Sequence, residues 1–160
     1  MTTGYRSWPG PVRTMAVAVD RAVSAARAGE AEDFSDAVGE LERLDRGQLA
    51  ALLGDVTRDL VERSHPDGLD AEDAEQLLDS AGRAAAPWYP ALDADALVKA
   101  LAGTLGVDDP DAPSPLTKPA VLAHGLLLVA DLLAGQPATL AEVLDLALRE
   151  LMRAQTIELP

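Results

Sequence analysis

The chain has no cysteine, few aromatic residues and no apolar run long enough to cross a bilayer. Without cysteine there is no disulfide, no thiolate nucleophile and no cysteine-ligated zinc, which fits a reducing compartment. The longest apolar stretch, residues 119–135, contains His124 and Asp131 and is shorter than the ~20 residues that a membrane helix needs. The apolar run from Met15 to Val19 is too short for a secretory signal. These absences favour a soluble, cytoplasmic protein.

The sequence also lacks the short motifs of common catalytic and cofactor sites. It contains no HExxH zinc motif, no GxSxG nucleophile elbow, and no GxxxxGK[ST] or GxGxxG phosphate loop. The acidic segments 67–79 and 108–111 lack the alternating oxygen ligands, central glycine and distal glutamate of a calcium loop. We therefore predict no catalytic residue, no metal site and no cofactor.

Positive charge is scarce, and the formal net charge is −14. Residues 1–29 carry +3, residues 30–111 carry −15 from 21 acids against six bases, and residues 112–160 carry −2. This balance argues against nucleic-acid binding, because binding to phosphates needs clustered lysine and arginine. The same argument applies to an anionic membrane surface. The charge allows a basic protein partner, but acidic helices with few lysines more commonly serve only to keep a protein soluble.

What the sequence has instead is a regular series of helix starts. At five places an apolar or small residue precedes a helix N-cap residue, and the steps of 25, 23, 24 and 22 residues leave room for one helix and one connection each. Apolar residues recur at three- and four-residue steps, and no run alternates as a strand would. The five pairs are Leu44-Asp45, Leu69-Asp70, Leu92-Asp93, Leu116-Thr117 and Ala138-Thr139. The predicted helices run from Pro11 to Gly29, Glu30 to Leu44, Asp45 to Ser64, Asp70 to Ala85, Asp93 to Leu105, Pro119 to Ala134 and Thr139 to Arg153.

The predicted fold class is all-α, a compact orthogonal or layered bundle of about seven helices. Residues 119–134 are apolar on nearly every face, which is typical of a helix at the centre of a bundle. A helical-repeat solenoid would also suit the spacing, but the helices share no repeated core positions. We predict an N-terminal extension over residues 1–10 and a single helical domain over residues 11–160. Prolines and aspartates concentrate at 107–116, which predicts an exposed loop.

Trp88 and Tyr89 are candidate contact residues, because they lie between Pro87 and Pro90 in a predicted connection and not on a helix. Amphipathic aromatic side chains are enriched where partners bind, so the pair predicts a recognition surface. The alternative is structural. A core of alanine, leucine and valine leaves gaps at the ends of a bundle, and an indole ring fills such a gap well.

His124 and Asp131 are the second pair of candidates. They lie seven residues apart on roughly the same face of the predicted apolar helix, about 10 Å apart along its axis. A functional pair would therefore need a cavity between them and a further polar group. Alternatively, His124 is a buried histidine that hydrogen-bonds a neighbouring carbonyl or a carboxylate from another helix. His65 precedes Pro66 in a predicted turn, which favours a surface position.

Two functional hypotheses follow from these patterns. The first is a non-enzymatic cytoplasmic protein that binds a basic protein partner through its acidic helices, as a regulatory, inhibitory or immunity-like component. The second is a small-molecule-binding or enzymatic helical domain with a cavity near His124 and Asp131. A pocket that holds both side chains would favour the second hypothesis, whereas a flat acidic face would favour the first. A homodimer formed through an apolar helix face is compatible with either.

Overall fold

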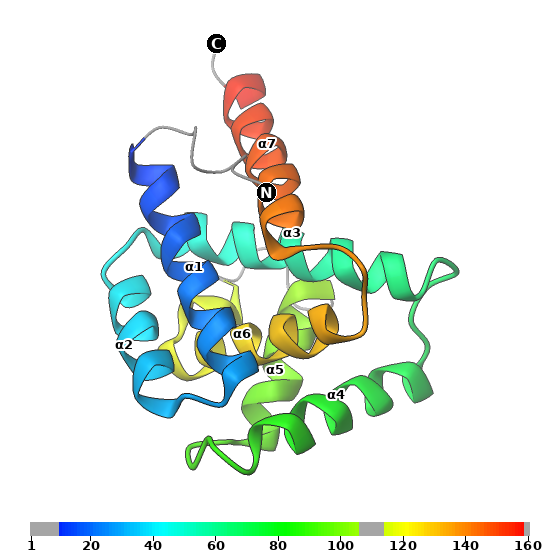
Figure 1. The fold of residues 1–160 in the computed structure, drawn as a ribbon. Helices are drawn as coiled ribbons and strands as arrows, with labels where there is room; N and C mark the ends of the chain where they lie inside the picture. Colours follow the sequence, from blue (N-terminus) through cyan, green and yellow to red (C-terminus); the bar gives the residue numbers. More distant parts are fainter. Residues whose placement is uncertain (1–9, 106–113, 159–160) are drawn as a thin grey trace.

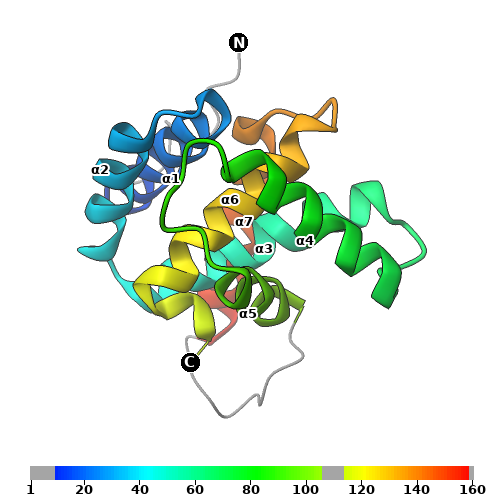
Figure 2. The same cartoon turned by 90° about the horizontal axis from the view of Figure 1, so that it is seen from below.

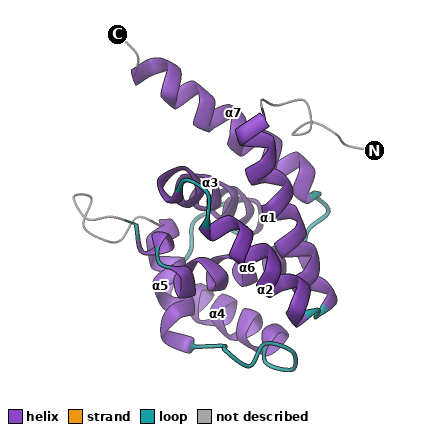
Figure 3. Cartoon of the chain, turned by 90° about the vertical axis from the view of Figure 1, so that its left-hand side faces the viewer, coloured by secondary structure: helices purple, strands orange, loops and turns teal. Residues whose placement is uncertain are grey.

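A computed structural model describes residues 10–105 and 114–158, with side chains up to residue 154. This part of the chain contains seven α-helices and one short 3-10 helix, with no strand, so the all-α prediction is confirmed (Figures 1 and 3). The predicted extension at residues 1–10, apart from Gly10, and most of the predicted loop at 107–116 lie outside the described residues. The elements are α1 (Gly10–Ala28), α2 (Ala31–Glu42), α3 (Arg46–Ser64), α4 (Ala71–Ala85), α5 (Ala94–Leu105), η2 (Pro115–Thr117), α6 (Pro119–Ala134) and α7 (Leu140–Glu158).

Four of the five predicted helix starts carry the expected cap, in which a side-chain oxygen accepts a hydrogen bond from a backbone N–H of the first turn. Only Asp70 takes part in a full capping box within the described residues, because the carboxylate of Asp73 also accepts from the Asp70 N–H. The four caps are Asp45 with the N–H of Gln48, Asp70 with that of Asp73, Asp93 with that of Asp95, and Thr139 with that of Glu142.

The prediction that Thr117 caps the helix over residues 119–134 is wrong. The hydroxyl of Ser114 accepts a hydrogen bond from the Leu116 N–H and so caps the short helix η2 instead. The Thr117 hydroxyl donates back to the Ser114 carbonyl at 2.8 Å and is not available to α6. α6 begins after Lys118, which has an extended backbone and no side-chain cap. The Ser114 and Thr117 hydroxyl groups both form hydrogen bonds within η2. These local bonds form instead of a side-chain cap for α6.

Leu116 packs against α6 and is 2% exposed. A Cβ atom at Gly125 would lie 2.9 Å from the Leu116 Cδ2 atom, which is closer than packed carbon atoms approach. Glycine at position 125 therefore permits the contact between η2 and α6. The described end of the segment predicted as an exposed loop is thus buried at Leu116.

α6 packs against α1, α2, α3, α4 and α5, and Figure 2 shows these helices around it. Twelve of its sixteen residues are buried, including Leu126 and Leu128, which are fully inaccessible to solvent. α7 packs against α3 and α1, while its C-terminal part extends away from the other helices (Figures 1 and 3). Each of these helices buries apolar side chains in the shared core, although Val17 of α1 and Val98 of α5 stay exposed.

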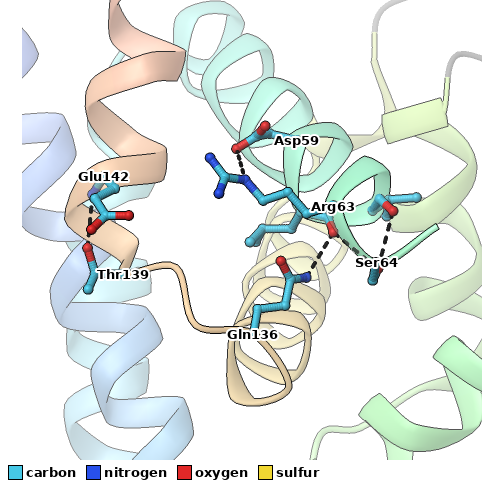
Figure 4. A network of polar contacts seen from close by, with 8 residues as sticks. Asp59, Arg63, Ser64, Gln136, Thr139 and Glu142 are labelled. Atoms are coloured by element: carbon cyan, nitrogen blue, oxygen red, sulfur yellow. Dashed lines mark hydrogen bonds and ion pairs between the residues drawn. The ribbon is translucent and has the colours of Figure 1, made fainter. Parts of the chain in front are cut away.

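The connection from α6 to α7 is attached to the end of α3 by a side-chain hydrogen bond. Figure 4 shows the Gln136 amide, whose Nε2 donates to the Leu60 carbonyl at 2.8 Å. The Ser64 hydroxyl donates to the same carbonyl at 3.2 Å. The Gln136 bond links the connection to α3, while the Ser64 bond lies within α3 and shares the same acceptor.

Candidate functional site

Trp88 and Tyr89 are half-buried, and their rings pack around Phe34, which projects from α2. The Phe34 ring meets the Trp88 ring edge-on at 5.3 Å between centroids and the Tyr89 ring at 5.4 Å. The indole N–H of Trp88 donates to the Ala84 carbonyl at 3.1 Å. Aromatic pairs with this geometry stabilise packing beyond the area they bury. The two rings therefore hold the connection between α4 and α5 against α2.

Gly29 lies under the Trp88 ring in the turn between α1 and α2. Its backbone φ is +71°, a conformation that favours glycine, and a Cβ atom there would lie 3.5 Å from the indole. The tight turn depends on glycine because of this φ, whereas the distance to the indole is that of an ordinary contact. Burial of the Tyr89 phenol beside these groups raises its pKa above 10.0.

His124 is 1% exposed, and both of its ring nitrogens have partners. Its Nδ1 lies 2.7 Å from the Ala120 carbonyl, and its Nε2 accepts a hydrogen bond from the Asp93 N–H at 2.9 Å. The carbonyl requires a proton on Nδ1 and the N–H requires a lone pair on Nε2, so the arrangement fits the neutral imidazole. The Tyr89 ring covers the imidazole at 5.7 Å between centroids. No lone pair is left for a metal ion, and no nitrogen is free for proton transfer.

Asp131 is half-buried on α6 and accepts a hydrogen bond from the Ser80 hydroxyl of α4 at 3.1 Å. Burial raises the pKa of its carboxyl above 3.8, although the bond from Ser80 acts in the opposite direction. Asp131 and His124 thus bond to separate groups from separate elements. The structure does not bring them together as a pair.

Asp131 instead shares a cavity with Trp88. The cavity has a volume of about 360 Å³ and lies between the end of α1, the face of α4 and the second half of α6. Neither His124 nor Tyr89 lines it. Its lining residues are Ala26, Arg27, Ala28, Gly29, Ala81, Ala84, Ala85, Trp88, Leu127, Ala130, Asp131 and Ala134.

Tyr89 lines a second depression of similar volume, about 360 Å³, between α2 and the start of α6. We call it the α2–α6 groove. Its walls combine apolar side chains with nearly as much polar surface, and Glu42 provides the carboxylate among its lining residues. The lining residues are Phe34, Ser35, Val38, Gly39, Glu42, Tyr89, Pro119, Ala120 and Ala123.

The acidic residues of α2 differ from those of the other helices in their ion pairs. α2 contains no lysine or arginine, and Glu32, Asp33 and Asp36 are exposed and form no ion pair within the described residues. The Asp33 carboxylate raises the pKa of Glu30 through a side-chain hydrogen bond and through its charge. Glu40 of α2 pairs with Arg21 of α1. α3, α4, α5 and α7 each contain at least one carboxylate that pairs with a cation one turn away. These pairs are Asp55 with Arg58, Asp59 with Arg63, Asp79 with Arg83, Asp95 with Lys99, Asp145 with Arg149 and Glu150 with Arg153.

Some of these relationships had no visible signal in the sequence. The contact between Ser80 and Asp131 joins residues that are 51 positions apart, and no pattern connects them. Phe34 did have a signal, because it is the one aromatic residue inside a predicted helix. The alanines of α4 permit close approach of another helix, but nothing in their spacing indicated the cavity that borders α4.

Across residues 10–105 and 114–158, no group of three or more histidine, aspartate or glutamate side chains is placed to hold a metal ion. In the same residues, no helix combines the length and apolar character needed to cross a membrane. Comparison with known proteins finds no matching family model, no matching curated protein and no matching solved structure.

Proposed function

We propose that this protein is a non-enzymatic cytoplasmic component that binds a basic protein partner through the outer surface of α2 and so acts in a regulatory, inhibitory or immunity-like role. The surface, which we call the α2 acidic face, consists of Glu30, Glu32, Asp33 and Asp36. One observation carries the proposal. α3, α4, α5 and α7 each hold at least one carboxylate paired with a cation of the same helix, whereas α2 has no cation of its own and Glu32, Asp33 and Asp36 form no ion pair within the described residues.

The α2 acidic face is suited to binding because its charges are held in fixed positions. The opposite side of α2 buries Phe34, Ala37, Val38 and Leu41, so the helix cannot turn its carboxylates away from each other. Asp33 raises the pKa of Glu30 through a side-chain hydrogen bond and then through its charge, so repulsion between these two carboxylates is a cost in the free protein. Lysine and arginine side chains of a partner would remove that repulsion and gain hydrogen bonds to charged acceptors.

The α2–α6 groove supplies an apolar contact beside these charges. Val38, Tyr89 and Pro119 are among its lining residues, and Glu42 belongs to both α2 and the groove. An interface is strongest where an apolar anchor enters a pocket surrounded by polar contacts. We therefore expect the partner to combine basic residues with one apolar side chain that enters this groove.

The test is a capture experiment with three forms of the protein. The first is the wild type, and the second is the triple variant Glu32→Gln, Asp33→Asn, Asp36→Asn. The third is a matched control, Glu62→Gln, Glu72→Gln, Glu75→Gln, which removes the same charge from exposed positions on α3 and α4. Because Glu32 and Asp33 lie in the first turn of α2 and Glu72 in that of α4, both variants also lose favourable helix-dipole contacts.

Each form is immobilised and exposed to the cytoplasm of the cells that produce the protein. We expect a basic protein to be held by the wild type and the control and lost from the α2 variant. Its association rate should fall as added salt shortens the screening length from ~10 Å to ~3 Å. Three results would contradict the proposal. They are a partner that binds all three forms equally, an association rate that does not change with salt, and recovery of nucleic acid.

The enzymatic alternative receives less support, because it required a cavity that contains both His124 and Asp131. His124 is enclosed by Ala120, Asp93 and Tyr89, and it does not line the cavity beside Asp131. A homodimer stays a prediction. Its test is the mass of the protein in solution over a range of concentrations.

A further inference from the structure

The cavity shared by Trp88 and Asp131 has the size of a small-molecule site. Its volume of about 360 Å³ falls within the range of roughly 300–1,000 Å³ that is usual for ligand pockets. Most of its wall is formed by alanine residues of α1, α4 and α6, with Leu127 and the Trp88 ring as the larger apolar side chains. The ring is fixed by its hydrogen bond to the Ala84 carbonyl and by the Phe34 edge. The apolar walls of the cavity are therefore in place before a ligand binds.

Two groups of opposite charge line this cavity and do not pair with each other. Asp131 comes from α6, and Arg27 comes from the last turn of α1. Within the described residues, Asp131 accepts one hydrogen bond, from Ser80, and Arg27 forms no ion pair. A carboxylate can accept about four hydrogen bonds and a guanidinium can donate five, so both have capacity left. Asp131 can receive an ammonium group, and Arg27 can receive a carboxylate in a bidentate arrangement.

The desolvation of Asp131 adds to this argument. Burial disfavours its charged form, and a cation in the cavity would reverse that penalty. A ligand with only a positive charge would also lie near the guanidinium of Arg27, which would repel it. A ligand with both charges satisfies the two groups at once, while a hydrocarbon side chain fills the space beside Trp88.

We propose that this cavity binds a small zwitterion of the amino-acid type with an apolar side chain. The ammonium group contacts Asp131, the carboxylate contacts Arg27, and the hydrocarbon lies against Trp88, Leu127 and the surrounding alanines. No residue of α2 lines the cavity, so this site is separate from the α2 acidic face. Failure of either proposal leaves the other unaffected.

The test uses L-leucine, L-valine, L-methionine and L-phenylalanine as probes. The Trp88 indole N–H resonance reports binding, and the substitution Trp8→Phe removes the second tryptophan so that one indole signal is left. We expect at least one of the four probes to shift this resonance in a saturable way. No shift from any of them at about 10 mM would overturn the proposal.

Two analogues of leucine separate the roles of the charges. 3-Methylbutylamine lacks the carboxylate, and 4-methylpentanoate lacks the ammonium group. Since a hydrogen bond to a charged group contributes about 1.5 to 3 kcal/mol in general, each analogue should bind roughly tenfold or more weakly than leucine. If the amine alone binds as well as leucine, Arg27 has no part in recognition and the zwitterion proposal fails.

Single substitutions test the residues directly. Asp131→Asn and Arg27→Gln should each weaken binding of the best probe by roughly tenfold or more. Ala84→Leu should block binding by filling the cavity from its exposed rim, and far-ultraviolet circular dichroism checks that each variant is folded. Glu62→Gln, at an exposed position on α3 outside the cavity and the α2 acidic face, is the matched charge control and should leave the affinity unchanged. Wild-type affinity in Asp131→Asn would overturn the proposal.

Discussion

The imidazole Nε2 of His124 accepts a hydrogen bond from the backbone N–H of Asp93 at 2.9 Å, which joins α6 to the start of α5. A helix leaves its first N–H groups without partners inside the helix, and the N–H of the N-cap residue is another group that must find one. Asp93 meets this need in two ways: its carboxylate accepts from the Asp95 N–H, and its own N–H donates to His124. The buried His124 therefore stabilises the start of α5 by accepting the hydrogen bond of the Asp93 N–H.

The first prediction is that His124→Ala lowers the free energy of unfolding. An unpaired Asp93 N–H costs about 1 to 3 kcal/mol, and the space left by the ring adds a cavity cost. Urea unfolding measures the difference. The control is His65→Ala, because His65 is half-buried at the end of α3 and the polar contacts of its ring within the described residues are with Ser64 and, at 3.9 Å, Asp73. Equal losses in the two variants would show that the bond to Asp93 contributes nothing.

The second prediction concerns the packing of α6. Leu128 is 0% exposed, so Leu128→Ala should lower the free energy of unfolding by about 2 to 5 kcal/mol through lost burial and a residual cavity. Leu146→Ala is the control, because Leu146 on α7 is 48% exposed and its truncation should cost less than about 1 kcal/mol. A loss below about 1 kcal/mol for Leu128→Ala would mean that α6 relaxes without leaving a cavity.

Helix positions and most helix caps could be predicted because their causes are local. Asp45, Asp70, Asp93 and Thr139 each bond to an N–H two or three residues away, and such spacing is visible in the sequence. Thr117 was predicted wrongly for an equally local reason. A second hydroxyl, that of Ser114, lies three residues earlier, and a pattern search cannot decide which of two caps forms.

The candidate site depended on relationships that local patterns do not contain. His124 and Asp131 share a face of α6 as predicted, yet their partners, Asp93 and Ser80, come from α5 and α4. Which neighbouring helix covers each half of α6 is decided by the packing of the whole bundle. The sequence therefore indicated His124 as a possible buried histidine and Asp131 as a candidate beside it, but it predicted neither Asp93 nor Ser80 as a partner.

The third prediction concerns the crowded carboxylates of the α2 acidic face. The Asp33 carboxylate raises the pKa of Glu30 above 4.5, by a side-chain hydrogen bond and by its charge. Asp33→Ala removes both causes, so the pKa of Glu30 should fall toward 4.5. Asp36→Ala, one turn further along, should leave the raised pKa in place. Side-chain carbon chemical shifts followed over a pH titration measure this, and an unchanged pKa in Asp33→Ala would contradict the proposed crowding.

The fourth prediction concerns Asp131 and the pH dependence of stability. Burial raises the pKa of this carboxyl in the folded protein above its ordinary value of 3.8. At pH values above the folded pKa, the ionised carboxylate opposes folding, because its charge is better solvated in the unfolded chain. As the pH falls through the folded pKa, the folded protein takes up a proton first, and the penalty decreases. Below 3.8 the carboxyl is protonated in both states, and the penalty is absent.

Asp131→Asn should therefore raise the free energy of unfolding at neutral pH, since an amide oxygen can still accept from Ser80 and carries no charge. The gain should shrink as the pH falls and vanish below 3.8. Urea unfolding across this pH range measures it. Glu62→Gln, at an exposed position with no ion pair among the described residues, corrects for the change in net charge. A gain that is the same at every pH, or equal in the two variants, would show that burial of Asp131 does not oppose folding.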